Sequence, residues 1–318
     1  MDKIIEAKNI TKIYKNGIAA NKNISLDIKK GEILGILGPN GAGKTTLIKQ
    51  IVGFLKPTSG KIYFNKEDIS LNPNLIRKNL CYQSQSNFVL RGLKTREALY
   101  YTGKLNKMTK NRIKEKIELL KKELDLNTVF NKEIENMSGG QKQIVNLAVS
   151  LVSDSKILVL DEPTNNLDPE KKALLIDFVH RLKLKYGYTI ILVSHNIFEI
   201  EKIADRVAII YDGSLLKLDT PKNYIALMGG DYKIKFFIHK DKIPKIENYF
   251  KNFSINEFGY TSIYIEEKKI FESMDYLNKE IGKEKLKDIK VLNTNLEDSY
   301  LFFLKNYRKN FIKEDLKK

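Results

Sequence analysis

The sequence has one cysteine in 318 residues and lacks long apolar runs. A single thiol, Cys81, excludes an internal disulfide framework and any metal site built from several cysteines. No stretch approaches the ~20 apolar residues that a membrane-spanning helix needs. The first residues, MDKIIEAKNITK, also lack the apolar core of a signal peptide. We therefore expect a cytoplasmic protein, which can still dock on a membrane partner.

Composition argues against wholesale disorder, because 42% of the residues are hydrophobic. The length fits two domains, or one large α/β domain with an appendage. The formal net charge of +17 raises the question of nucleic acid. The basic residues are scattered, however, so that residues 221–318 carry +5 and residues 1–220 carry +12. We interpret them as solvated surface lysines and expect no nucleic-acid partner; a mild attraction to an anionic membrane surface stays open.

The most informative motif is GPNGAGKTT at residues 38–46. It follows the apolar run 33–37 and precedes a helical pattern, as a phosphate-binding P-loop requires. Its glycines let backbone N–H groups turn toward phosphate oxygens, while Lys44 can reach the β- and γ-phosphates and Thr45 can hold Mg²⁺. The candidate nucleotide-binding residues are Asn40, Gly41, Gly43, Lys44, Thr45 and Thr46. The sequence thus predicts a protein that binds a nucleoside triphosphate.

Two carboxylates close a short apolar strand at residues 156–160. Asp161 at the strand tip can hold the Mg²⁺ shell, and Glu162 can orient or deprotonate an attacking water. An acidic turn without chemistry is the alternative, and the P-loop upstream argues against it. His195 follows another strand and can contact a γ-phosphate, although a lone histidine at such a place is more often structural.

Strands and helices alternate through residue 210, which predicts a mostly parallel sheet flanked by helices. A ligand is expected at the carboxyl ends of its strands. Tyr14 precedes the P-loop strand and can either stack on an adenine ring or pack on the sheet edge. The expected elements are strands at 3–10, 23–28, 32–37 and 61–64, a turn at Gly17, a charged helical region at 95–130, a helix capped by Ser138 at 140–152, a helix at 169–185, and a hairpin of 207–211 and 214–218.

From about residue 3 to residue 220, the chain resembles the nucleotide-binding subunit of an ABC transporter. The motifs that carry the resemblance are GPNGAGKTT at 38–46, MSGGQ at 137–141, ILVLDEPT at 157–164, NNLD at 165–168 and VSH at 193–195. SGGQ followed some twenty residues later by LDEPT is very specific. The resemblance implies an α/β fold with a P-loop NTPase core of ABC type. Its parts are a mostly parallel sheet flanked by helices, an antiparallel N-terminal subdomain and a helical signature subdomain at about 86–150.

The resemblance also implies roles for single residues. Gln85, rather than Gln83, matches the glutamine that touches Mg²⁺ and the attacking water, and Tyr14 matches the aromatic residue that stacks on adenine. Residues implied to bind the γ-phosphate held by a second subunit, or to align the interface with it, are Ser138, Gly139, Gly140, Gln141 and Asp168. The implied catalytic residues are Glu162, His195, Gln85 and Lys44. The implied Mg²⁺ ligands are Thr45, Gln85 and Asp161.

ATP and Mg²⁺ are therefore the implied cofactors, and two subunits would enclose two ATP molecules between them. The implied partners are an integral membrane permease and a second nucleotide-binding subunit. We expect two copies of this chain to form a homodimer, while pairing with a different ATPase stays open.

Residues 226–318 are expected to form a small α+β domain after an ATPase domain at 1–225. Met228-Gly229-Gly230 indicates a linker, and the runs that follow predict a βαββαβ unit with a final helix. The expected strands are 231–239, 255–260, 262–267 and 288–292, and the expected helices are 243–253, 270–281 and 296–307. The ending NTNLEDSYLFFLKNYRK resembles the tail of ABC-2-type drug and antibiotic exporters. This resemblance implies a domain that regulates or braces the dimer.

The leading hypothesis is an export ATPase held at the inner face of the cell membrane by its permease. An importer ATPase is the first alternative, against which the single cassette and the LEDSYLFF tail argue. A soluble ABC ATPase acting on ribosomes or DNA is the second. Ribosome-acting members fuse two cassettes, and DNA-repair members insert long coiled coils where only about 90 residues intervene here.

Overall fold

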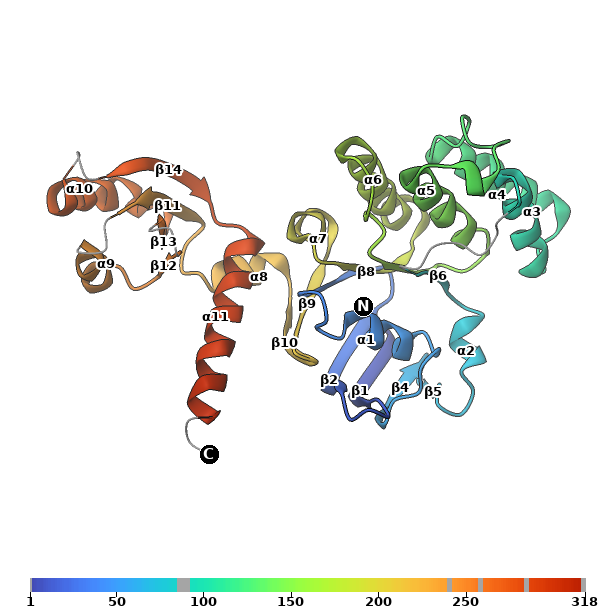
Figure 1. Cartoon of the computed structure of the whole chain (residues 1–318), viewed down its shortest axis with the longest axis horizontal. Helices are drawn as coiled ribbons and strands as arrows, with labels where there is room; N and C mark the ends of the chain where they lie inside the picture. The colour runs from blue at the N-terminus through green and yellow to red at the C-terminus, as the bar shows by residue number, and fades with distance from the viewer. Residues whose placement is uncertain (1, 85–91, 239–241, 257–259, 283–285, 316–318) are drawn as a thin grey trace. The chain divides into compact units, whose positions relative to one another are not determined.

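The computed structural model describes residues 2–84, 92–238, 242–256, 260–282 and 286–315. It divides the chain into two compact units, Met1–Leu218 and Asp219–Lys318 (Figure 1). Within the described ranges, no helix has the length and apolar character to cross a bilayer. Each unit has its own hydrophobic core.

The first unit is built on a six-stranded sheet in the order β10-β9-β3-β8-β7-β6. Its strands are β3 (Ile33–Leu37), β6 (Cys81–Gln83), β7 (Ile157–Asp161), β8 (Thr189–Ser194), β9 (Arg206–Tyr211) and β10 (Ser214–Asp219). All pairs from β9 to β6 run parallel. Every residue of β3, β7 and β8 is buried, which explains their unbroken apolar runs. The predicted parallel sheet is confirmed, and the carboxyl ends of these three strands lie at one edge.

The predicted hairpin turn lies between β9 and β10, which are neighbours in this sheet. Asp212 and Gly213 both have positive φ, at 46° and 74°. Two successive positive φ values are what a type I′ turn requires, and Asp-Gly is a favoured pair for it.

A second, antiparallel sheet of the first unit has the order β2-β1-β4-β5. Its strands are β1 (Lys3–Ile13), β2 (Ala19–Lys29), β4 (Ser59–Phe64) and β5 (Glu67–Asp68). The strands predicted at 3–10 and 23–28 were too short. Asn9 and Asn23 have positive φ and the register shifts beside them, which interrupts the alternation of apolar residues without ending the strands.

The helices of the first unit are α1 (Lys44–Ile51), α2 (Asn74–Arg77), α3 (Thr95–Leu105), α4 (Lys110–Glu123), α5 (Gly139–Ser150), α6 (Pro169–Tyr186) and α7 (Ile197–Ile203). Figure 1 shows α3, α4 and α5 gathered on one side of this unit. The helical region predicted at 95–130 is not continuous, because α3 ends at Leu105 and α4 covers only Lys110–Glu123. Lys107 has a φ of 58°, Thr109 caps α4 through Arg112 N, and residues 124–130 form turns. The chain therefore changes direction twice where the sequence pattern looks continuous.

The second unit contains a four-stranded antiparallel sheet in the order β12-β13-β11-β14. Its elements are α8 (Pro221–Ala226), β11 (Tyr232–Phe237), α9 (Ile243–Tyr249), β12 (Phe253–Ile255), β13 (Tyr260–Ile265), α10 (Ile270–Ile281), β14 (Lys287–Asn293) and α11 (Leu296–Asp315). From β11 to β14 this is the predicted βαββαβ order, and the strand order is that of a split βαβ fold.

The second unit differs from the prediction in several details. The strand predicted at 255–260 has wrong bounds, because β12 ends at Ile255 and Asn256 is outside any strand, while residues 257–259 lie outside the described ranges. The helix predicted at 243–253 ends at Tyr249, because Phe253–Ile255 pairs with β13 as a strand. The segment predicted as a linker, Met228-Gly229-Gly230, is a turn inside this unit, and Met228 is only 4% exposed. The buried Met228 side chain anchors this segment in the second unit, although the two glycines that follow it suggest a flexible linker.

Candidate active site

The P-loop connects β3 to α1 at the carboxyl edge of the parallel sheet. Two glycines are fixed by close backbone approach. A Cβ on Gly38 would lie 2.2 Å from the Ile210 carbonyl oxygen, and one on Gly43 would lie 2.1 Å from that of Ala20. Gly43 also has a φ of 95°, and Gly41 has a φ of 82°, which side-chain-bearing residues rarely adopt. The loop conformation therefore depends on glycine at these places.

Lys44 points back into the loop from the start of α1. Its ammonium donates to the carbonyl oxygens of Gly38 at 2.8 Å and Pro39 at 3.0 Å, and it lies 3.9 Å from Glu162 Oε1. Burial lowers the pKa of Lys44, while the charges of Glu162 and Asp161 oppose that shift. The ammonium is thus held where the loop converges with the end of β7.

Thr45 and Asp161, two of the residues expected to bind Mg²⁺, lie next to each other. The Thr45 hydroxyl donates to Asp161 Oδ1 at 3.4 Å. Asp161 is fully buried, and within the described part of the chain its Oδ2 has no hydrogen-bond partner. Burial raises the pKa of Asp161, and the neighbouring Glu162 charge adds to this rise. A buried carboxylate oxygen without a partner, next to a hydroxyl, fits a hard cation such as Mg²⁺.

Glu162 and His195 are brought together from the ends of β7 and β8. His195 Nδ1 lies 2.7 Å from Glu162 Oε2, which is hydrogen-bond distance. The carboxylate is almost buried, whereas the imidazole is half exposed. Glu162 has a φ of 56°, and its backbone N–H donates to Val193 O at 2.9 Å. A left-handed glutamate costs conformational energy, and such strain is concentrated at functional sites.

Tyr14 lies beside the start of α1, as its predicted contact with the nucleotide requires. Its hydroxyl is 3.2 Å from Thr46 Oγ1, and its ring is 40% exposed. Asn40 and Gly41 are exposed at the tip of the P-loop. The Lys12 ammonium lies 5.8 Å from the centroid of this ring. The predicted stacking of Tyr14 on adenine stays a prediction.

Ser138 caps α5, as predicted. Its hydroxyl accepts a hydrogen bond from Gln141 N at 3.3 Å, while Gln141 Oε1 accepts one from Ser138 N at 3.1 Å. This reciprocal capping box fixes the first turn of the helix. Ser138 and Gly139 are exposed, Gly140 is half buried, and a Cβ added to Gly139 would meet only Asn166 Cβ at 3.9 Å. The helix N-terminus is therefore open on one side.

Asp168 has a structural role that the sequence did not indicate. Its Oδ1 caps α6 by accepting a hydrogen bond from Lys171 N at 2.9 Å, and its Oδ2 is ion-paired with the Lys171 ammonium. These contacts lower the pKa of Asp168, with the side-chain hydrogen bond as the largest cause. In the described structure, no hydrogen bond or ion pair joins Asp168 or the α5 cap to the P-loop.

Gln85, the predicted glutamine at the metal, lies outside the described residues. Gln83, which the resemblance set aside, is the last residue of β6 and is 1% exposed. Neither polar atom of its side chain has a hydrogen-bond partner among the residues that the structure describes. The structure therefore leaves the role of Gln85 as a prediction.

A buried amide pair that sequence analysis missed supports the P-loop. Asn21 on β2 is fully buried; its Nδ2 donates to Gly43 O at 3.2 Å, and its Oδ1 accepts from Gln50 Nε2 at 2.6 Å. The pair links β2 to α1 beneath the loop. One polar residue in an alternating strand gives no sequence signal for such a contact.

A buried carboxylate, Glu199 on α7, supports the other half of the site. Its Oε2 accepts hydrogen bonds from Thr164 Oγ1 at 2.8 Å and Ser194 Oγ at 3.1 Å, and its Oε1 accepts one from Asn196 Nδ2 at 3.0 Å. Two of these donors flank His195, and the third follows Glu162 by two residues. Glu199 therefore joins the segments that carry the hydrogen-bonded pair, which its place on an amphipathic helix did not reveal.

Comparisons with known proteins agree with this geometry. Residues 21–165 match the family model described as "ABC transporter". The chain is 35% identical over 224 residues to the glucose import ATP-binding protein GlcV of Saccharolobus solfataricus, covering 69% of this chain and 64% of that protein. It is 30% identical over 293 residues to ABC transporter A family member 8 of Arabidopsis thaliana, covering 90% of this chain and 31% of that protein. The chain thus spans less than two thirds of either relative.

Among solved structures, the chain resembles the dimeric structure of a post-hydrolysis state of the ATP-binding cassette MJ0796 bound to ADP and Pi. The TM-score is 0.63 at 27% identity, covering 68% of this chain and 98% of that one. The predicted P-loop core with its parallel sheet, antiparallel subdomain and helical subdomain is confirmed by this likeness.

Proposed function

From the ABC transporter ATP-binding domain that this chain carries, we propose that the protein is the ATP-hydrolysing subunit of a transporter that exports its cargo through a separate membrane permease. The observation that carries the proposal is the Glu162–His195 pair at 2.7 Å, beside Lys44 and the Thr45–Asp161 pair. These are the parts that phosphoryl transfer to water requires.

The roles follow from the geometry. When bound, ATP and Mg²⁺ supply a γ-phosphoryl group whose charge is partly neutralised by the metal. Thr45 and Asp161 would hold the ion, and Lys44 would exchange its loop carbonyls for phosphate oxygens. Glu162 would accept a proton from the attacking water through its carboxylate. His195 fixes that carboxylate by a hydrogen bond, and the exposed side of its imidazole would be available to the γ-phosphate.

One subunit leaves the γ-phosphate open on the side opposite the P-loop. We propose that the exposed α5 N-terminus of a second copy, with Ser138, Gly139, Gly140 and Gln141, covers that side. Helix N-termini bind anions through free N–H groups and the helix dipole. Two copies related by a two-fold axis would then share two ATP molecules, and hydrolysis would loosen the contact. Asp168 would act at this interface by fixing the start of α6.

Export is the direction that the second unit favours. The match to the plant A-family protein covers 90% of the chain, whereas that to the glucose importer covers 69%. The LEDSYLFF ending resembles the tail of exporter ATPases, and we propose that residues 226–318 regulate or brace the dimer. The 35% identity to GlcV is the observation that favours the alternative, an importer subunit. In either case we place the protein at the inner membrane face through its permease, with no nucleic-acid partner.

The test is ATP-induced dimerisation of Glu162→Gln, measured by size exclusion with multi-angle light scattering. Loss of the proton acceptor should stop turnover while ATP binding persists, so the dimer should accumulate. A second change, Ser138→Arg, should restore the monomer, whereas Ser70→Arg, at an exposed serine remote from the motifs, should not. A variant that binds ATP and stays monomeric would contradict the homodimer, and one that binds no ATP would contradict the function.

A further inference from the structure

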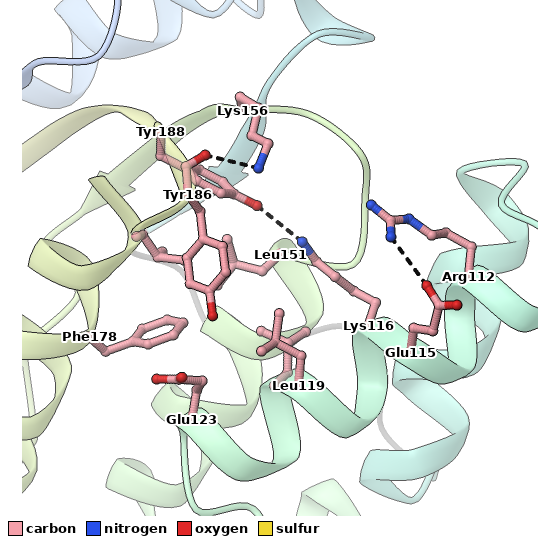
Figure 2. Close-up of a pocket in the computed structure, with 12 residues that line it drawn as sticks. Arg112, Glu115, Lys116, Leu119, Glu123, Leu151, Lys156, Phe178, Tyr186 and Tyr188 are labelled. Atoms are coloured by element: carbon pink, nitrogen blue, oxygen red, sulfur yellow. Dashed lines mark hydrogen bonds and ion pairs between the residues drawn. The ribbon is translucent and has the colours of Figure 1, made fainter. Parts of the chain in front are cut away.

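A pocket of about 240 Å³ lies among α4, the end of α5 and α6 (Figure 2). Lys156 on its rim directly precedes β7, whose other end is Asp161. A strand of this length spans roughly 17 Å, so the pocket is separate from the nucleotide site. Its buried lining is apolar and aromatic and consists of Leu120, Leu151, Phe178, Leu182 and Tyr188.

Two ammonium groups converge on one tyrosine ring in this pocket. Lys116 Nζ donates to the Tyr188 hydroxyl at 3.1 Å and lies 5.8 Å from the ring centroid. Lys156 Nζ lies 4.8 Å from the same centroid and donates to Tyr186 O at 3.0 Å. Figure 2 shows both side chains directed toward the aromatic wall. In the described structure, neither ammonium contacts a carboxylate.

The carboxylates on the rim are already matched by arginines. Glu115 pairs with Arg112 at 3.2 Å, and Glu123 pairs with Arg181 at 3.1 Å. Arg112 is further paired with Asp154 at 3.1 Å. Among the residues that the structure describes, Lys116 and Lys156 are therefore the charges of this pocket that have no ion-pair partner.

In the absence of a ligand, this arrangement lowers the stability of the folded protein. Burial lowers the pKa of Lys116, and the charges of Lys156 and Arg112 lower it further, while Cys81 and the Asp154 carboxylate oppose the shift. A half-buried cation such as Lys116, next to an apolar wall and without an ion-paired carboxylate, costs free energy, whereas the exposed Lys156 is solvated. Perturbed groups that converge in a pocket are candidates for ligand binding.

We propose that this pocket binds a small aromatic carboxylate. The ligand ring packs between Phe178 and the two tyrosines, and its carboxylate lies between the ammonium groups of Lys116 and Lys156. The volume is below the ~300 Å³ at which sites for drug-sized ligands begin, which limits the ligand to one or two rings. Because α4 and α6 both line the pocket, the bound ligand would also fix the helical subdomain against the sheet.

The test is direct binding of 2-naphthoate to the full chain, measured by calorimetry and saturation-transfer NMR. We expect saturable binding at millimolar concentration or below, and at least tenfold weaker binding of the neutral isostere 2-naphthalenemethanol. Lys116→Gln and Lys156→Gln should each weaken naphthoate binding by roughly tenfold, which corresponds to ~1.4 kcal/mol. Lys122→Gln, which removes an exposed lysine of α4 outside the pocket, is the matched control and should bind normally.

Three results would overturn the proposal. The first is that naphthoate does not bind to the folded protein at 5 mM ligand, about five times the weakest expected Kd. The second is that the neutral alcohol binds as tightly as naphthoate. The third is that naphthoate binds to the lysine variants as tightly as to the wild type. If Lys116→Gln does not fold, Lys156→Gln decides the matter, because Lys156 is exposed and its loss leaves no core defect. None of these measurements depends on ATP hydrolysis, so the proposed function can fail independently.

Discussion

Replacing Glu199 by glutamine removes one charge from the interior and keeps the shape of the side chain. The carboxylate accepts three hydrogen bonds, two at Oε2 and one at Oε1. A glutamine can place its single oxygen toward Thr164 and Ser194, but its NH₂ group then faces the donating Nδ2 of Asn196. Rotating the Asn196 amide would separate these two NH₂ donors. It would also break the hydrogen bond by which Asn196 Oδ1 caps α7, accepted from Phe198 N at 3.1 Å.

The structure sets the size of the effect. One hydrogen bond to a buried charge is lost and two are weakened, so the first unit should lose about 2 to 3 kcal/mol of unfolding free energy. His195 should shift with Asn196, and displacements of about 1 Å at a reacting centre can lower kcat by up to ~100-fold. The KM for ATP should change little, because Glu199 supports neither the P-loop nor Tyr14.

The assays are urea unfolding followed by circular dichroism and steady-state phosphate release. Glu118→Gln, which removes an exposed carboxylate from α4, is the control for the change in net charge and should match the wild type in both. Glu199→Asp restores the charge on a shorter side chain and should recover part of the stability. A Glu199→Gln protein with wild-type stability and kcat would refute the idea that this carboxylate positions the Glu162–His195 pair.

Three further predictions follow from other buried polar groups. Asn21→Ala removes the hydrogen bonds that Asn21 makes to Gln50 Nε2 at 2.6 Å and to Gly43 O at 3.2 Å beneath the P-loop. It should cost about 1 to 3 kcal/mol in thermal unfolding and weaken ATP binding in filter assays. Asp161→Asn should raise Tm in EDTA at pH 7 while abolishing Mg²⁺-dependent turnover. Burial raises the folded-state pKa of Asp161, so its ionisation opposes folding; the Tm gain should shrink as the pH falls through that raised pKa and disappear below the unfolded pKa. In the wild-type protein the buried Lys233 ammonium lies 2.7 Å from Asp298 Oδ2. Asp298→Asn leaves this ammonium without a counter-charge. It should destabilise the second unit by about 3 to 5 kcal/mol, seen as a downshift of one of two melting transitions.

Local sequence alone was sufficient for much of the site. The strand–glycine loop–helix order around residues 38–46 requires one backbone path, because glycine tolerates positive φ and close backbone approach where other residues do not. The capping box at Ser138 is likewise encoded by the residues that form it. The βαββαβ order of the second unit followed from alternation and helical spacing within short segments.

Element ends were less predictable, since tertiary contacts decide them. Lys107 ends one helical run only in the context of two packed helices, and the apolar residues around Phe253 become a strand because β13 is available to pair with them. Met228 is buried within the second unit although two glycines follow it.

The sequence by itself predicted which residues would carry the chemistry, because P-loop glycines, a lysine, a threonine and two strand-end carboxylates have few other uses in that order. Only the tertiary structure decided what supports them. Asn21, Glu199 and the Lys116–Lys156 pocket join segments far apart in the chain, and each member alone has no pattern that distinguishes it from an ordinary polar residue. The strand order β9-β3-β8-β7 brings the Glu199 partners together at the carboxyl edge of one sheet, whereas Asn21 reaches the P-loop from β2 of the antiparallel sheet. The pocket adds Lys116 of α4 to residues that precede the amino ends of β7 and β8.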